Sequence, residues 1–165
     1  MLTHRLGALV ATLSLFVQPA SAAEPTQKEA EPLVRMVLQR ALQSYDYLPD
    51  RPLLPVVPPF LLREEVGGTD LKLTAAMLGA AADKFTLRTA KKLQEQADTS
   101  GKEVYYVTIA GVDVTSDKAT LYVGVGLQIP RSAGTGKLCC CVARDHFAKV
   151  KGEWRYAGRE RTICS

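Results

Sequence analysis

The sequence predicts an α+β domain in which N-terminal helices pack on a four-stranded antiparallel meander sheet. Two observations support this fold class. In the first half of the chain, apolar residues recur at intervals of three and four, which is the period of an amphipathic helix. From residue 103 onward they alternate with a period of two, which is the period of a half-buried strand.

Residues 1–22 have the pattern of a secretory signal peptide. An arginine precedes a short apolar stretch, residues 6–17, and small residues form an A-x-A cleavage pattern that ends at Ala22. The apolar stretch is shorter than the ~18 residues of a membrane-spanning helix, and no later stretch is long enough. We therefore expect a secreted or periplasmic protein without a membrane span, whose residues 23–165 form a single α+β domain.

Helical signals fill much of the first half. Thr26 is followed three residues later by a glutamate, which is the spacing of a capping box, and an apolar stripe follows. This pattern predicts a helix from about residue 27 to 47. Two further helices are expected at about 71–84 and 86–97, with Thr86 as the cap of the second.

Residues 48–66 are read as a proline-rich strap, with five prolines between residues 49 and 59. Proline destabilises a helix interior and removes a hydrogen-bond donor from a central strand, so a run of prolines argues against both. We expect the segment to lie extended across the domain with its apolar side chains covered, namely Leu53, Leu54, Val56, Val57 and Phe60. The alternative is a docking peptide for a proline-reading domain.

Residues 103–165 are expected to form the antiparallel sheet. The strand-like runs "VYYVTIAGVDV" and "KATLYVGVGLQI" are separated by "TSDK", which has the composition of a turn. Two more strands follow around "VKGEW". Lys151 and Gly152 are placed at the centre of a tight hairpin turn, because glycine supplies the positive φ that such turns need.

The chain holds four cysteines, three of them consecutive. In an exported protein they are expected to form disulfides. With the hairpin turn placed as above, Cys139 lies directly opposite Cys164, so we predict a bridge between these two residues. Cys140 points to the other face. It and Cys141 would then be free or joined in a strained adjacent bridge, or Cys140 would link two chains in a homodimer.

The same register sorts the charged residues of the last strands onto two faces. One face is basic and carries Arg144, His146, Arg155, Arg159 and Arg161. Such a face suits a phosphate, a sulfated sugar or an acidic protein partner. The alternative is that these arginines are only solvated. The other face is apolar except for Asp145 and Glu160. A carboxylate in an apolar pocket has a raised pKa and can act as a base. Charges that protect a sheet edge are the alternative.

Overall charge and motifs exclude several classes. The formal net charge is only +4, whereas proteins that bind nucleic acid usually carry a dense basic stripe. The sequence contains no serine-nucleophile motif, phosphate-binding loop or HExxH pattern. Neither nucleic acid nor a cofactor is therefore expected.

The runs "VYYVTIAGVDVTSDKATLYVGV" and "DHFAKVKGEWRYAG" resemble the closing strands of the nuclear-transport-factor-like (SnoaL-like) superfamily. The resemblance implies helices packed on a strongly curved antiparallel sheet, which forms a cone with an apolar pocket. Some members use this pocket for isomerase or hydrolase chemistry, and many use it only for binding or dimerisation. No catalytic motif of these members is matched.

From these observations we expect an exported, non-catalytic binding or interaction module of unknown partner. The first alternative is a pocket enzyme of the isomerase or hydrolase kind, with Asp145 or Glu160 as its base. The second is a metal or redox protein in which Cys139, Cys141 and Cys164 form a cluster of thiolates. The absence of C-x-x-C spacing argues against the second alternative, so no metal site is predicted.

Overall fold

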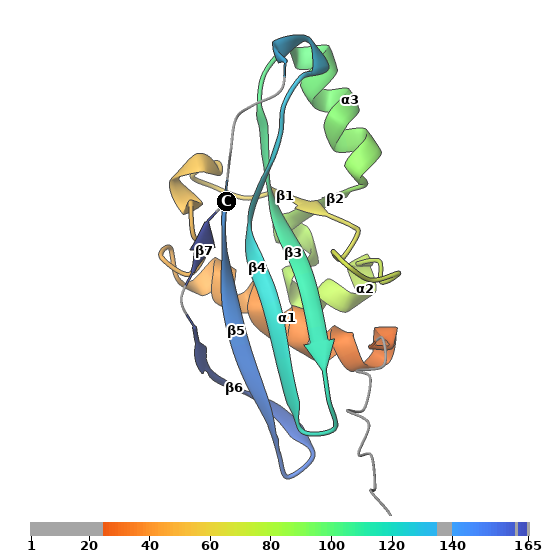
Figure 1. Cartoon of the computed structure of the whole chain (residues 1–165), viewed down its shortest axis with the longest axis vertical. Coiled ribbons are helices and arrows are strands. Elements are labelled where there is room, and N and C mark those ends of the chain that lie inside the picture. Colours follow the sequence, from red (N-terminus) through yellow and green to blue (C-terminus); the bar gives the residue numbers. More distant parts are fainter. Residues whose placement is uncertain (1–24, 135–139, 161, 165) are drawn as a thin grey trace, which may run out of the picture.

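The computed structural model describes residues 25–134, 140–160 and 162–164. Within these residues the expected α+β class is confirmed, with helices packed on a seven-stranded sheet (Figure 1). The predicted signal peptide, residues 1–22, lies outside the described residues. No helix in the described part of the chain is long and apolar enough to cross a membrane.

The first helix, α1, spans Gln27–Gln43 and begins with the predicted capping box. The Thr26 side chain accepts a hydrogen bond from the backbone of Glu29, whose carboxylate in turn accepts one from the backbone of Thr26. The helix ends four residues earlier than expected. The turn that follows carries Tyr45 and Tyr47, which take part in two clusters described below.

The strap contains a short 3-10 helix, η1 (Arg51–Leu53), and strand β1 (Phe60–Arg63). Leu54 and Phe60 are buried, but Val56 and Val57 are 85% and 68% exposed, so the expectation that all apolar side chains of the strap are covered was wrong. Strand β1 begins directly after the last proline, where backbone N–H groups are again available for a sheet.

The next segment differs from the two predicted helices. It forms α2 (Ala75–Leu78), the 3-10 helix η2 (Gly79–Lys84), strand β2 (Phe85–Arg88) and α3 (Ala90–Ser100). Helix α3 is capped by the side chain of Thr89 instead of Thr86, because residues 85–88 pair with β1 as a parallel strand. Pairing distant in sequence therefore overrides the local helical pattern.

The remaining strands are β3 (Val104–Val114), β4 (Lys118–Gln128), β5 (Cys141–Val150), β6 (Glu153–Arg159) and β7 (Ile163–Cys164), and a 3-10 helix, η3 (Arg131–Ala133), follows β4. The sheet order is β2-β1-β3-β4-β5-β6, with β7 paired to β5. Neighbouring strands from β3 to β6 are antiparallel, as expected, but β1 lies parallel to both β2 and β3. The sheet is therefore mixed, and the prediction of a four-stranded antiparallel sheet was incomplete.

The helices cover two faces of the sheet. Helices α1 and α2 pack on one face and form the main core with residues such as Ile109 and Leu121. Helix α3 packs on the other face near one end of β3, where Leu93 contacts Val104 and Tyr106 (Figure 1). The rest of this second face is the outer face of the sheet, and it carries Thr120 and Tyr122 of β4.

The closing hairpin turns at Lys151 and Gly152 as predicted, with φ values of 52° and 85°. The predicted register holds from the pair Val150–Glu153 to the pair Phe147–Tyr156. It then shifts by one residue, because Ala157 is the extra residue of a β-bulge in β6.

This bulge exchanges the faces of all β6 residues that follow it, since side chains alternate along a strand. Asp145 consequently pairs with Arg159, and the Glu160 backbone bonds to that of Arg144. Arg159 turns to the core side and Glu160 to the outer face, opposite to the predicted arrangement. The assignment of Glu160 to the apolar face and of Arg159 to the basic face was therefore wrong.

The disulfide also differs from the prediction, because the pairing of the last strands is shifted from the predicted register. A further shift beyond β6 pairs Cys141 with Cys164, and these two residues form the disulfide. The predicted Cys139–Cys164 bridge was wrong, and Cys139 lies outside the described residues. Cys140 is also disulfide-bonded, so an inter-chain bridge through its sulfur would require that bond to be exchanged.

Candidate functional site

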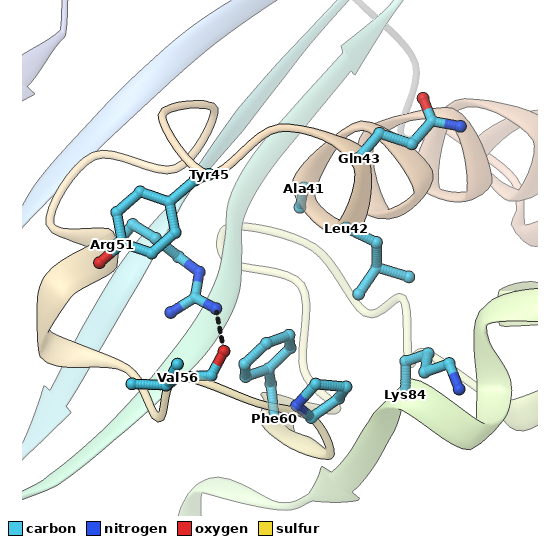
Figure 2. A pocket seen from close by; sticks show the side chains of 9 residues that line it. Ala41, Leu42, Gln43, Tyr45, Arg51, Val56, Phe60 and Lys84 are labelled. Carbon is cyan, nitrogen blue, oxygen red and sulfur yellow. Dashed lines mark hydrogen bonds between the residues drawn. The ribbon is translucent and has the colours of Figure 1, made fainter.

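A pocket lies between the end of α1, the strap and η2, and we call it the strap pocket. Its volume is about 430 Å³, within the range of ~300–1,000 Å³ typical of small-molecule sites. Figure 2 shows the side chains that surround it. It is lined by Ala41, Leu42, Gln43, Tyr45, Arg51, Val56, Pro58, Phe60 and Lys84.

Arg51 is the buried cation of the strap pocket, with only 6% of its surface exposed. Its Nη1 and Nη2 atoms donate to the backbone oxygens of Pro55 and Val56, at 2.8 and 3.4 Å. The guanidinium carbon lies 5.0 Å from the centre of the Tyr45 ring and 4.6 Å from that of Phe60 (Figure 2). Arg51 thus joins the strap to the turn after α1 through carbonyl and cation–π contacts.

The charge of Arg51 has no acidic partner. No carboxylate forms a salt bridge with it in the part of the chain that the structure describes. The other cation of the strap pocket, Lys84, lies 2.7 Å from the carboxylate of Asp83. Within the described residues, the strap pocket therefore contains one buried positive charge whose partners are carbonyl oxygens and aromatic rings and not a carboxylate.

The strap pocket was missed by the sequence reasoning. Eight of its nine lining residues fall between residues 41 and 60, but only the fold brings the end of α1, the strap and Lys84 of η2 around one cavity. One signal was present, because Arg51 is a single cation at the start of the apolar and proline-rich run "RPLLPVVPPF". An arginine within such a segment is either solvated or held by specific contacts, and here it is held.

Asp145, a predicted base, is buried on the core side with 0% exposure. Its carboxylate accepts hydrogen bonds from Nε and Nη2 of Arg159, at 2.7 and 3.0 Å, and from the hydroxyl of Tyr47. Nη1 of Arg159 also donates a hydrogen bond to the backbone oxygen of Tyr47. We call these three residues the buried triad.

The pKa values agree with a closed structural cluster. Burial, the hydrogen bond to Asp145 and the charge of that carboxylate together raise the pKa of the Tyr47 hydroxyl well above its ordinary value. Burial alone would lower the pKa of Arg159, but its hydrogen bonds to Asp145 and the attraction of that carboxylate raise it. Asp145 is not among the residues that line the strap pocket. The buried triad therefore fixes β5 and β6 to the turn after α1.

Glu160, the other predicted base, lies on the outer face and is half exposed. It accepts a hydrogen bond of 2.7 Å from Arg144, and its carboxylate lies 3.6 Å from Nε2 of His146. The hydrogen bond from Arg144 lowers the pKa of Glu160, with a further contribution from His146. Nδ1 of His146 is 3.1 Å from the hydroxyl of Thr120.

The predicted basic face is thus only partly assembled. Arg144, His146 and Arg155 lie on the outer face, but Glu160 offsets the charge of Arg144, and Arg155 lies 3.7 Å from the carboxylate of Glu153. Arg159 belongs to the buried triad. Arg161 lies outside the described residues. The described outer face therefore carries mixed charge and no concentrated positive patch.

The cysteines do not form the thiolate cluster considered above. Cys141 and Cys164 are bonded to each other, which removes two of its three thiolates. The backbone N–H of Cys141 also donates to the carboxylate of Asp50, at 2.6 Å, and so connects β5 to the strap. Among the described residues, no group of three or more histidine, cysteine or acidic side chains is arranged to hold a metal ion.

Comparison with known proteins gives no relative: no family model, no curated protein and no solved structure matches this chain. The resemblance of the closing strands to the nuclear-transport-factor-like superfamily remains a prediction. The function must therefore be argued from the geometry of this chain.

Proposed function

We propose that the protein is a non-catalytic binding module whose strap pocket holds a small molecule. The observation that carries the proposal is a buried arginine, with no acidic partner among the described residues, in the wall of a mainly apolar cavity of about 430 Å³. A mainly apolar lining with a few placed polar groups is usual for small-molecule sites.

The composition of the lining favours binding over catalysis. No carboxylate, histidine, cysteine, serine or threonine is among its described lining residues, so a carboxylate or histidine base and a serine, threonine or cysteine nucleophile are absent from it. Asp145 is fully engaged in the buried triad and lies outside this lining.

The entrance of the strap pocket also favours a ligand. Val56 is 85% exposed and Tyr45 is 56% exposed, although both line the cavity. Covering exposed apolar surface at a concave site with a ligand removes that surface from water and so stabilises the complex. A bound molecule would therefore contact the exposed side chains as well as the buried ones.

We also propose export to the periplasm or the medium, as the first residues of the sequence suggest. The disulfide between Cys141 and Cys164 is compatible with an oxidising compartment. Sequencing the N-terminus of protein recovered outside the cytoplasm should show cleavage after Ala22. An intact N-terminus on protein found only in the cytoplasm would contradict export.

The binding proposal is tested by titrating the oxidised protein with Nile red, an uncharged probe whose fluorescence rises in apolar sites. We expect saturable binding with one site per chain. Val56→Trp at the entrance should weaken binding about fivefold or more by filling the cavity. The matched control is Val57→Trp, since Val57 is also exposed but does not line the strap pocket. Fluorescence without saturation, or equal effects of the two substitutions, would contradict the proposal.

A further inference from the structure

We infer that the strap pocket selects a monoanionic amphiphile: a molecule with one carboxylate or sulfonate group that pairs with Arg51 and an apolar body that lies against Leu42 and Phe60. This inference rests on the proposed function, because it names the chemical class of ligand for the same site. It follows from the charge, the free donors and the lining of the strap pocket.

The charge argument concerns Arg51 alone. A charged group taken out of water is costly unless another charge or several hydrogen bonds compensate it. Arg51 is 6% exposed, and the described residues supply carbonyl oxygens and aromatic rings but no carboxylate within salt-bridge distance. A ligand anion would supply the missing compensation, and this is what gives an anionic ligand its advantage over a neutral one.

The arrangement of donors leaves room for such an anion. The Tyr45 and Phe60 rings are neighbours of the guanidinium group, and cation–π contacts are made through ring faces. The guanidinium has more N–H donors than the carbonyls of Pro55 and Val56 use. A carboxylate accepts from guanidinium N–H groups in their own plane, so it does not compete with the rings.

The lining limits the ligand to a single negative charge. Lys84 is already paired with Asp83, and the other polar side chains among the lining residues, Gln43 and Tyr45, are uncharged amide and phenol groups. A phosphate or nucleotide with two or more charges would bring unpaired charge into an apolar cavity, which is unfavourable. An apolar body, in contrast, would bury its surface against Leu42, Val56 and Phe60.

The test compares two ligands of nearly the same shape on the oxidised wild-type protein by calorimetric titration. One is 2-naphthoate, which is anionic at neutral pH, and the other is 2-naphthamide, which is neutral. We expect 2-naphthoate to bind about tenfold more tightly, since a charge-assisted pair is roughly twice as strong as a neutral hydrogen bond. Inorganic phosphate should not compete with it.

The outcomes separate this inference from the proposed function. Equal affinity for the two ligands, with saturable binding of both, would overturn the inference and leave the proposed function intact. Binding of neither ligand, together with no saturable binding of Nile red, would overturn both. Competition by inorganic phosphate would overturn the inference, because the site would then select for charge without an apolar body.

Variants locate the anionic group. Arg51→Gln keeps a donor for the strap carbonyls but removes the charge, so it should reduce 2-naphthoate affinity about tenfold and reduce 2-naphthamide affinity much less. The matched control is Arg88→Gln, because Arg88 also donates to a backbone oxygen, that of Leu87, but does not line the strap pocket. Near-ultraviolet circular dichroism checks that each variant is folded. A larger loss of 2-naphthoate affinity in Lys84→Met than in Arg51→Gln would overturn the inference. If Arg51→Gln fails to fold, the comparison of the two ligands on the wild-type protein still tests it.

Discussion

The buried triad yields the sharpest prediction about stability. Asp145 and Glu160 were both expected on the apolar face, and the bulge at Ala157 places them in opposite environments. Replacing each carboxylate by its neutral amide compares these environments with the same chemical change. Asp145→Asn should be strongly destabilising, and Glu160→Gln should have little effect.

The magnitude for Asp145 follows from its contacts. Breaking a buried ion pair by removing one partner costs ~3–5 kcal/mol when the other charge stays buried. Arg159 retains 23% exposure and its contact with the Tyr47 backbone, so we expect a value near the lower end, about 3 kcal/mol. For Glu160 the ion pair with Arg144 lies in solvent, where such pairs contribute little.

Urea unfolding at neutral pH, followed by circular dichroism with the disulfides intact, measures this difference. With a denaturant slope of about 1.5 kcal/mol per molar, Asp145→Asn should lower the midpoint by about 2 M. The double variant Asp145→Leu, Arg159→Met should recover much of the loss, because it leaves no charge unpaired in the core. Equal midpoints for Asp145→Asn and Glu160→Gln would refute the assignment of Asp145 to the buried triad.

Three further predictions test other parts of the structure. The pKa of Tyr47 is raised above its ordinary value of 10.0, so above about pH 10 the folded chain keeps a proton that the unfolded chain releases. The contribution of Tyr47 to stability is therefore full below about pH 10 and falls by about 1.4 kcal/mol per pH unit above it. Urea midpoints between pH 9 and 11 should show this loss in wild type and not in Tyr47→Phe, and equal pH dependence of the two proteins would contradict the raised pKa. Gly124→Ala should cost about 2 kcal/mol or more, because its new Cβ would lie 2.3 Å from the backbone oxygen of Cys141. Gly101→Ala meets no atom within 4 Å but must adopt a φ of 63°, so it should cost only the ~1 kcal/mol of a left-handed backbone, and thermal unfolding of both variants compares the two costs. Peptide mapping without reduction should recover Cys141 bonded to Cys164, and recovery of Cys164 bonded to another cysteine would show that the register of β7 is different.

Local signals in the sequence were sufficient for elements that depend on a few neighbouring residues. The capping box at Thr26 and Glu29 predicts the start of α1 because both hydrogen bonds are made within one turn. The turn at Lys151 and Gly152 was predicted because a two-residue hairpin needs positive φ. The α+β class follows from the change of hydrophobic period along the chain.

The bulge in β6 could not be placed from alternation alone, because one extra residue leaves the pattern of the adjacent strand unchanged. A signal was nevertheless present at Gly158, since glycine inside a strand often marks a bulge, and its φ is 138°. This single residue shift exchanged Arg159 and Glu160 between faces. It also contributed to the error in the disulfide.

Long-range contacts account for the other differences. Residues 86–88 were expected to begin a helix, and their parallel pairing with β1 makes them part of strand β2 instead. Most of the strap-pocket lining falls between residues 41 and 60, but its concave shape depends on how the end of α1, the strap and η2 fold together, which no local pattern predicts. Arg51 was the one residue there with an unusual local context.

The proposed function depends most on the strap pocket as the binding site, and methyl NMR spectra of the oxidised protein titrated with 2-naphthoate test this directly. Methyl groups of Leu42 and Val56, which line the strap pocket, should shift and saturate together. Those of Val142 and Ile163, on β5 and β7, should not move. Shifts confined to Val142 and Ile163, or no saturable shift at Leu42 and Val56, would contradict the account.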